Sequence, residues 1–101
     1  MPEMTFTVRW PDGRTQSCYS PSLVMHDHLV AGEDYTVAEF LTRTTTALTE
    51  ASERVRAKFG MYCTSASEQM QELERAGRTL DPQSLVRVLE MNPASLPGES
   101  R

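Results

Sequence analysis

The chain has 101 residues, of which 39% are hydrophobic and 24% charged, and its formal net charge at pH 7 is −4. These values are typical of one small globular domain. They argue against disorder, against a cleft between two domains, and against the basic surface that nucleic-acid binding usually requires.

The sequence favours a cytoplasmic location without a membrane segment. No apolar run approaches the roughly 20 residues that cross a bilayer. The first residues, Met1 to Met4, lack the basic and apolar regions of a secretory signal. Only two cysteines occur, Cys18 and Cys63, whereas a small secreted domain normally carries more cross-links than one bridge.

The beginning of the chain predicts a β-hairpin. Apolar and polar residues alternate from Met4 to Trp10, which is the period of a half-buried strand. Pro11-Asp12-Gly13 then has the composition of a tight turn, and residues 14–19 form the returning strand.

Two registers of this hairpin are open. A turn with a bulge pairs Trp10 with Arg14, sets Phe6 opposite Cys18 and directs Cys18 into the core. A two-residue loop would turn Cys18 outward. We expect the first register because proline fits it better.

A long helix is expected after residue 35. Thr36 and Glu39 have the spacing of a capping box, and Gly60 is a natural left-handed stop. The intervening residues 23–34 predict a packed connection with a short strand or a helical turn. One apolar stripe follows the helix, formed by Val37, Phe40, Leu41, Thr44, Leu48, Ala51, Val55 and Phe59.

The remaining pattern completes an α+β fold. A second, shorter helix is expected to begin after Ser65, with Met70 and Leu73 facing inward, and to end at Gly77. Residues 85–91 predict a last strand beside the first, whose direction the sequence leaves open. We therefore expect two helices packed on one face of a small, mostly antiparallel sheet, in a single domain over residues 1–91. Residues 92–101 are expected to form a disordered tail.

The two cysteines are the first candidate site. Cys63 lies just before the second helix, where the helix dipole would favour a thiolate. The alternative, and commoner, role of unpaired cysteines is that of small apolar side chains in a core. Whether Cys18 and Cys63 lie close enough to form a redox pair is left open.

A second candidate is the His26-Asp27-His28 cluster, which could supply metal ligands. Nothing fixes the spacing of a further protein ligand, so a surface loop is the preferred interpretation. We expect no metal and no cofactor. The sequence also contains neither a nucleophile elbow nor a glycine loop that cradles phosphate.

Aromatic residues near the hairpin suggest a surface for a partner. Trp10 and Tyr19 could anchor another protein, although the preferred interpretation of Trp10 is that it closes one end of the core. The exposed edge of a small sheet would also allow a homodimer.

Five separated segments form a further pattern over about residues 2–75, and in chain order they read PEMTFTVRWPDG, CYSPSLV, GEDYTVAEFL, ASERVRAKFG and YCTSA. Together they resemble a small bacterial family of nitrogen starvation response proteins. The resemblance implies a gene cluster that also encodes a nitrilase, a radical-SAM protein, an acetyltransferase and a flavin-dependent oxidoreductase. It supplies no catalytic residue to carry over.

The expected function is that of a non-enzymatic accessory protein in a nitrogen-scavenging, nitrilase-associated pathway. It would bind a protein partner from that pathway through the hairpin at Trp10 and through two further segments. These contain Cys18, Tyr19 and Pro21, and Tyr62, Cys63 and Ser65. The alternative is a small enzyme or subunit that uses Cys63 as a nucleophile, with His26 or His28 as its base, on a nitrogen-containing small molecule.

Overall fold

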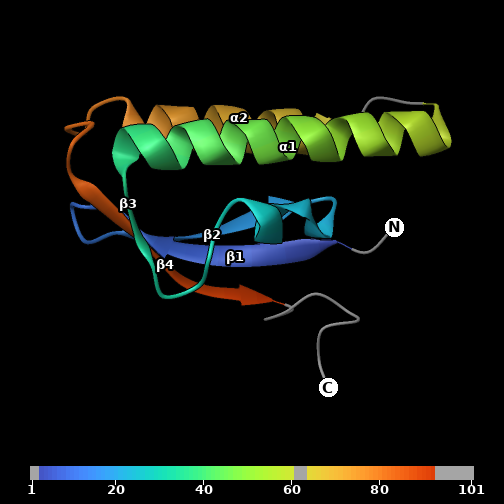
Figure 1. The fold of residues 1–101 in the computed structure, drawn as a ribbon. Coiled ribbons are helices and arrows are strands. Elements are labelled where there is room, and N and C mark those ends of the chain that lie inside the picture. Colours follow the sequence, from blue (N-terminus) through green and yellow to red (C-terminus); the bar gives the residue numbers. More distant parts are fainter. Residues whose placement is uncertain (1–2, 61–63, 93–101) are drawn as a thin grey trace, which may run out of the picture.

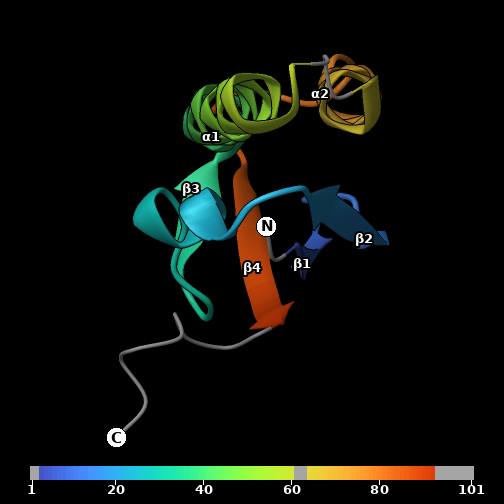
Figure 2. The same cartoon turned by 90° about the vertical axis from the view of Figure 1, so that its right-hand side faces the viewer.

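The computed structural model describes residues 3–60 and 64–92. Four strands form one sheet in the order β2-β1-β4-β3, and all neighbouring strands are antiparallel. Both long helices cover the same face of this sheet, so the molecule has two layers (Figures 1 and 2). The predicted α+β fold is therefore confirmed. The elements in chain order are β1 (Met4–Arg9), β2 (Thr15–Ser20), the 3-10 helix η1 (Leu23–Asp27), β3 (Asp34–Thr36), α1 (Val37–Phe59), α2 (Thr64–Gly77) and β4 (Leu85–Asn92).

The hairpin of β1 and β2 has the bulged register that the sequence favours. The Trp10 N–H donates to the Arg14 carbonyl oxygen at 2.8 Å, and the Gly13 N–H donates to the Trp10 carbonyl oxygen at 2.9 Å. Gly13 has a φ of 93°, which a residue without a Cβ adopts readily. Phe6 consequently pairs with Cys18, and Cys18 lies in the core.

The connection between β2 and α1 contains both a helical turn and a strand. η1 supplies the turn, and its N-cap Ser22 accepts a hydrogen bond from Val24 N–H. The three-residue strand β3 pairs with β4, which also pairs antiparallel with β1. The direction that the sequence left open is thus antiparallel, and β4 lies between β1 and β3.

The ends of α1 match their predicted signals. The Thr36 hydroxyl accepts a hydrogen bond from Glu39 N–H at 3.1 Å. Gly60 is left-handed, with a φ of 74°, and its N–H donates to Arg56. In contrast, α2 begins at Thr64 rather than after Ser65. Thr, Ser and Ala follow one another here, so composition alone does not single out the capping residue.

The core lies between the sheet and the helices. Trp10, at 2% exposure, meets Phe40 edge-to-face, with the ring centroids 5.4 Å apart. Of the predicted stripe on α1, Leu41 and Val55 are half-buried. The fully buried members are Val37, Phe40, Thr44, Leu48 and Ala51. Within the described residues, no helix has the length and apolar character needed to span a membrane.

Candidate functional site

β2 is an outer strand of the sheet, with β1 as its only neighbour in the sheet of the described residues (Figure 2). Half of its backbone N–H and C=O groups therefore point away from β1. In an antiparallel pair, directly opposed residues alternate between hydrogen-bonded and non-hydrogen-bonded types. The hydrogen bond from Trp10 N–H to Arg14 fixes this alternation. Thr15, Ser17 and Tyr19 therefore direct their N–H and C=O groups outward from the sheet.

One end of this edge is covered by α2. The side-chain oxygen of Gln69 accepts a hydrogen bond from Tyr19 N–H at 2.8 Å. Gln69 is only 7% exposed, and its side-chain nitrogen has no hydrogen-bond partner among the described residues. Gln69 binds the Tyr19 N–H, and no other described residue forms a hydrogen bond with the outward backbone groups of Thr15 and Ser17. We call this stretch, Thr15 to Ser17, the β2 edge.

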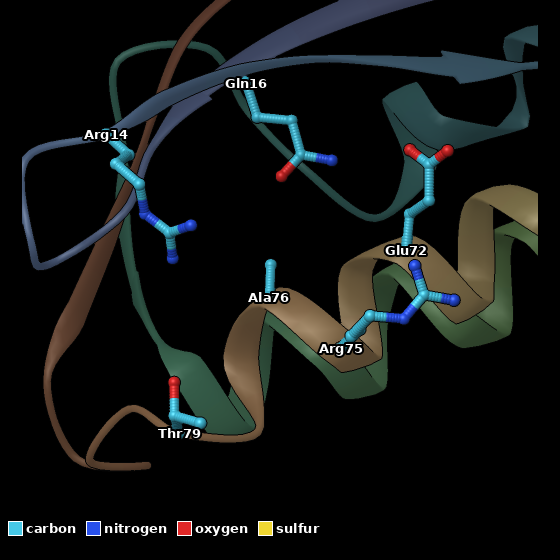
Figure 3. A pocket seen from close by; sticks show the side chains of 6 residues that line it. All are labelled: Arg14, Gln16, Glu72, Arg75, Ala76 and Thr79. Carbon is cyan, nitrogen blue, oxygen red and sulfur yellow. The ribbon is translucent and has the colours of Figure 1, made fainter.

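A pocket of about 340 Å³ adjoins the β2 edge. Figure 3 shows Arg14 and Gln16 on the strand side and Glu72, Arg75 and Ala76 on α2. Thr79, which follows the helix, completes the lining. We call this the β2–α2 pocket.

The strand side of the β2–α2 pocket is held in place by neighbouring side chains. The Asp12 carboxylate accepts from the Arg14 N–H at 3.1 Å and from Arg14 Nε at 2.6 Å. These bonds lower the pKa of the Asp12 carboxyl, and the bond from the Arg14 backbone N–H makes the largest contribution. Trp10 Nε1 donates to Gln16 Oε1 at 2.9 Å. The Gln16 side-chain NH₂ group is consequently left available to the pocket.

Cys18 is a neighbour of Gln16 on β2, but it is buried in the core and does not line the β2–α2 pocket. The residue is 2% exposed, and burial raises the pKa of its thiol to about 12, with a further contribution from the negative charge of Glu72. A thiol in that state contains almost no thiolate near neutral pH. The geometry at Cys18 therefore suits packing rather than nucleophilic chemistry.

A comparison with protein families matches residues 5–91 to the family described as nitrogen starvation-induced protein NitG. The chain belongs to this family. The matched range contains both long helices and all four strands except their outermost residues, Met4 and Asn92. Neither the curated proteins nor the solved structures gave a match.

In this NitG-family chain, the predicted partner residues lie at both ends of β2. Trp10 is buried beside the start of β2. At the other end, Tyr19 is half-buried and Pro21 is buried. Tyr62 and Cys63 lie outside the described residues. Ser65 belongs to the first turn of α2.

α2 and β2 lie side by side, and each end of β2 lies near a different part of α2. Gln69 contacts Tyr19, whereas Ala76 lines the pocket with Arg14. α2 thus runs antiparallel to β2 (Figure 1). The backbone of Ser65 consequently lies toward the Ser20 end of β2, on the same side as Tyr19 and Pro21.

The histidine cluster lies at η1, away from β2. His28 Nε2 is 2.7 Å from Glu50 Oε1, and the His28 carbonyl oxygen accepts from Arg43. His26 is half-buried and Asp27 is exposed. Within the described part of the chain, no group of three or more His, Cys, Asp or Glu side chains is placed to hold a metal ion.

Sequence reasoning missed Gln69 and the charged residues of the pocket. Glu72 and Arg75 are exposed residues of a helix that looks ordinarily amphipathic. Gln69 occupies the same face as Leu73, and a polar residue on an apolar stripe is the one signal that could have indicated a buried amide.

Proposed function

We propose that the chain is a non-enzymatic accessory protein of a nitrogen-scavenging, nitrilase-associated pathway in the cytoplasm. It acts by binding a protein of that pathway. Family membership supports the setting, because the family is described as nitrogen starvation-induced. The nitrilase association and the binding role are part of the proposal.

The β2 edge is the observation that carries the binding role. Among the described residues, the outward N–H groups of Thr15 and Ser17 have no hydrogen-bond partner. Both residues are exposed. Proteins usually cover or blunt such an edge, because an extended segment of another chain can pair with it. Several peptide-binding domains bind their partners by adding a strand in this way.

The edge also explains why the partner would be an extended segment rather than a helix. Main-chain hydrogen bonds at Thr15 and Ser17 would supply register and affinity. Gln69 already occupies the Tyr19 N–H, so pairing would stop before that residue. The added strand would therefore be short, and contacts beyond β2 must contribute to specificity.

The test is native mass spectrometry of the tagged chain, purified from nitrogen-starved cells of its own source. Wild-type protein is expected to carry one pathway protein in a fixed stoichiometry. Ser17→Pro removes the outward N–H without removing a bond to β1, and proline is tolerated where the N–H of an edge strand faces solvent. This variant is expected to lose the partner, whereas Ser17→Thr, which keeps the N–H, is expected to retain it.

Three results would contradict the proposal. The first is a Ser17→Pro variant that folds by circular dichroism and still binds the partner. The second is a homodimer of the purified chain that Ser17→Pro dissociates, since the edge would then be occupied by a second copy. The third is turnover of a nitrile or an amide by the purified chain alone.

A further inference from the structure

The β2–α2 pocket has a charge pattern that suits a small molecule. Its lining contains two guanidinium groups, Arg14 and Arg75, and one carboxylate, Glu72. Its volume of about 340 Å³ lies near the lower end of the range of about 300–1,000 Å³ that small-molecule sites usually have. Three of its six lining side chains are charged, so we expect its ligand to be charged as well.

On the strand side of the pocket, hydrogen bonds to neighbouring residues already hold the donor side chains Arg14 and Gln16 in place. Asp12 binds Arg14 through Nε and the main-chain N–H, which leaves both terminal nitrogens of the guanidinium for another acceptor. Trp10 holds the Gln16 side-chain oxygen, which leaves the NH₂ group as a donor. Binding a carboxylate here would require little new ordering of these two side chains.

The helix side supplies charges that are not already neutralised. Within the described residues, neither Glu72 nor Arg75 has an ion-pair partner within 4.0 Å. Ala76 lies on the same helix, one turn after Glu72, and Thr79 adds a hydroxyl (Figure 3). Both signs of charge are therefore available on the same wall of the pocket.

We infer that the β2–α2 pocket binds a small zwitterion with two carboxylates and one ammonium group, that is, an acidic α-amino acid. Arg14 and Arg75 bind the carboxylates as forked donors, and Glu72 accepts from the ammonium group. The two guanidinium groups thus serve the two carboxylates of the ligand, Arg14 through the terminal nitrogens that Asp12 does not bind, and the single carboxylate of Glu72 serves the ammonium group. Gln16 and Thr79 contribute neutral hydrogen bonds. The inference does not depend on the proposed protein partner.

The test uses the purified, isotope-labelled chain and two matched probes. L-Glutamate has the inferred charge pattern, and 2-oxoglutarate has the same two carboxylates with a keto group in place of the ammonium. L-Glutamate is expected to shift the NMR signals of the Gln16 side-chain amide and of the last turns of α2. 2-Oxoglutarate is expected to bind at least about tenfold more weakly, the effect of losing one charge-assisted hydrogen bond.

Three substitutions assign the roles. Arg75→Gln is expected to weaken both probes by about tenfold or more. Glu72→Gln is expected to abolish the preference for L-glutamate over 2-oxoglutarate. Arg78→Gln is the matched control, because it removes the same charge from an exposed residue that does not line the pocket. The affinity of this variant is expected to stay within about twofold of the wild type, since Arg78 does not line the pocket and its charge acts on the ligand only through screening solvent.

The inference is overturned by any of four results. The first is no signal shift with L-glutamate, and the second is equal binding of L-glutamate and of inorganic phosphate, which serves as a third probe for unspecific anion binding. The third is a loss in Arg78→Gln as large as in Arg75→Gln, and the fourth is an unchanged preference in Glu72→Gln. None of them concerns the protein partner, so the proposal for the β2 edge would stand or fall separately.

Discussion

The thiol of Cys18 is predicted to be almost unreactive in the folded chain. Burial, with a smaller contribution from Glu72, raises its pKa from 9.0 to about 12. Because the thiolate is the nucleophile, this difference lowers the reactive fraction at pH 8 by about 1,000-fold. Cys18 is also only 2% exposed, so an alkylating reagent reaches the thiol only when the structure opens locally or unfolds.

The assay is alkylation by iodoacetamide, read by mass spectrometry, in a Cys63→Ser variant that leaves Cys18 as the only thiol. At pH 8 the folded protein is expected to react at least about 1,000-fold more slowly than the same protein in urea. Equal rates in the folded and unfolded states would refute the burial argument and restore Cys18 as a candidate nucleophile.

The same shift predicts how stability depends on pH. The folded-state pKa is raised, so the protonated thiol contributes its full stability below about pH 9, and this stability is lost as the pH rises toward 12. The loss amounts to about 4 kcal/mol at most, at about 1.4 kcal/mol per pKa unit. The difference in free energy of unfolding between the wild type and Cys18→Ala isolates this effect from other titrating groups. It should be constant below pH 9 and fall above it; a constant difference up to pH 11 would contradict the shift.

Two further predictions concern stability, measured by urea unfolding followed by circular dichroism. Thr36→Ala removes the acceptor of the Glu39 N–H and is expected to lower the free energy of unfolding by about 1 kcal/mol. Thr46→Ala, at an exposed position of α1, should be neutral or stabilising, and an equal loss in both variants would contradict the capping role. Trp10→Phe removes the hydrogen bond to Gln16 and buried volume, and is expected to cost about 2–3 kcal/mol. A cost below about 0.5 kcal/mol, the usual size of a surface substitution, would show that Trp10 does not close the core.

Local chemistry explains which elements the sequence could predict. The hairpin register depends on Pro11 and Gly13, and the start of α1 depends on Thr36 and Glu39, which are near neighbours in the chain. The sequence left a short strand open for residues 23–34 but did not place β3 at residues 34–36, because these three residues form a strand only by pairing with β4 about 50 residues later. No pattern within residues 34–36 carries that information.

The candidate site depends even more on distant contacts. Sequence reasoning selected aromatic and thiol residues, since their chemistry is visible in the residue type. The β2 edge is a property of strand order, and Thr15 and Ser17 have no distinctive side chains. The β2 edge ends before Tyr19 because the Tyr19 N–H donates to Gln69, which is 50 residues away in the chain. Such features become visible only when the helix is placed beside the strand.

Amide hydrogen exchange at Ser17 tests the central claim most directly. In the isolated chain, Ser17 N–H is expected to exchange rapidly, while the N–H groups of Gln16 and Cys18, which face β1, exchange slowly. In the complex with the partner from nitrogen-starved cells, Ser17 N–H should become as slow as its two neighbours. Unchanged, rapid exchange at Ser17 in a saturated complex would contradict binding by strand addition at the β2 edge.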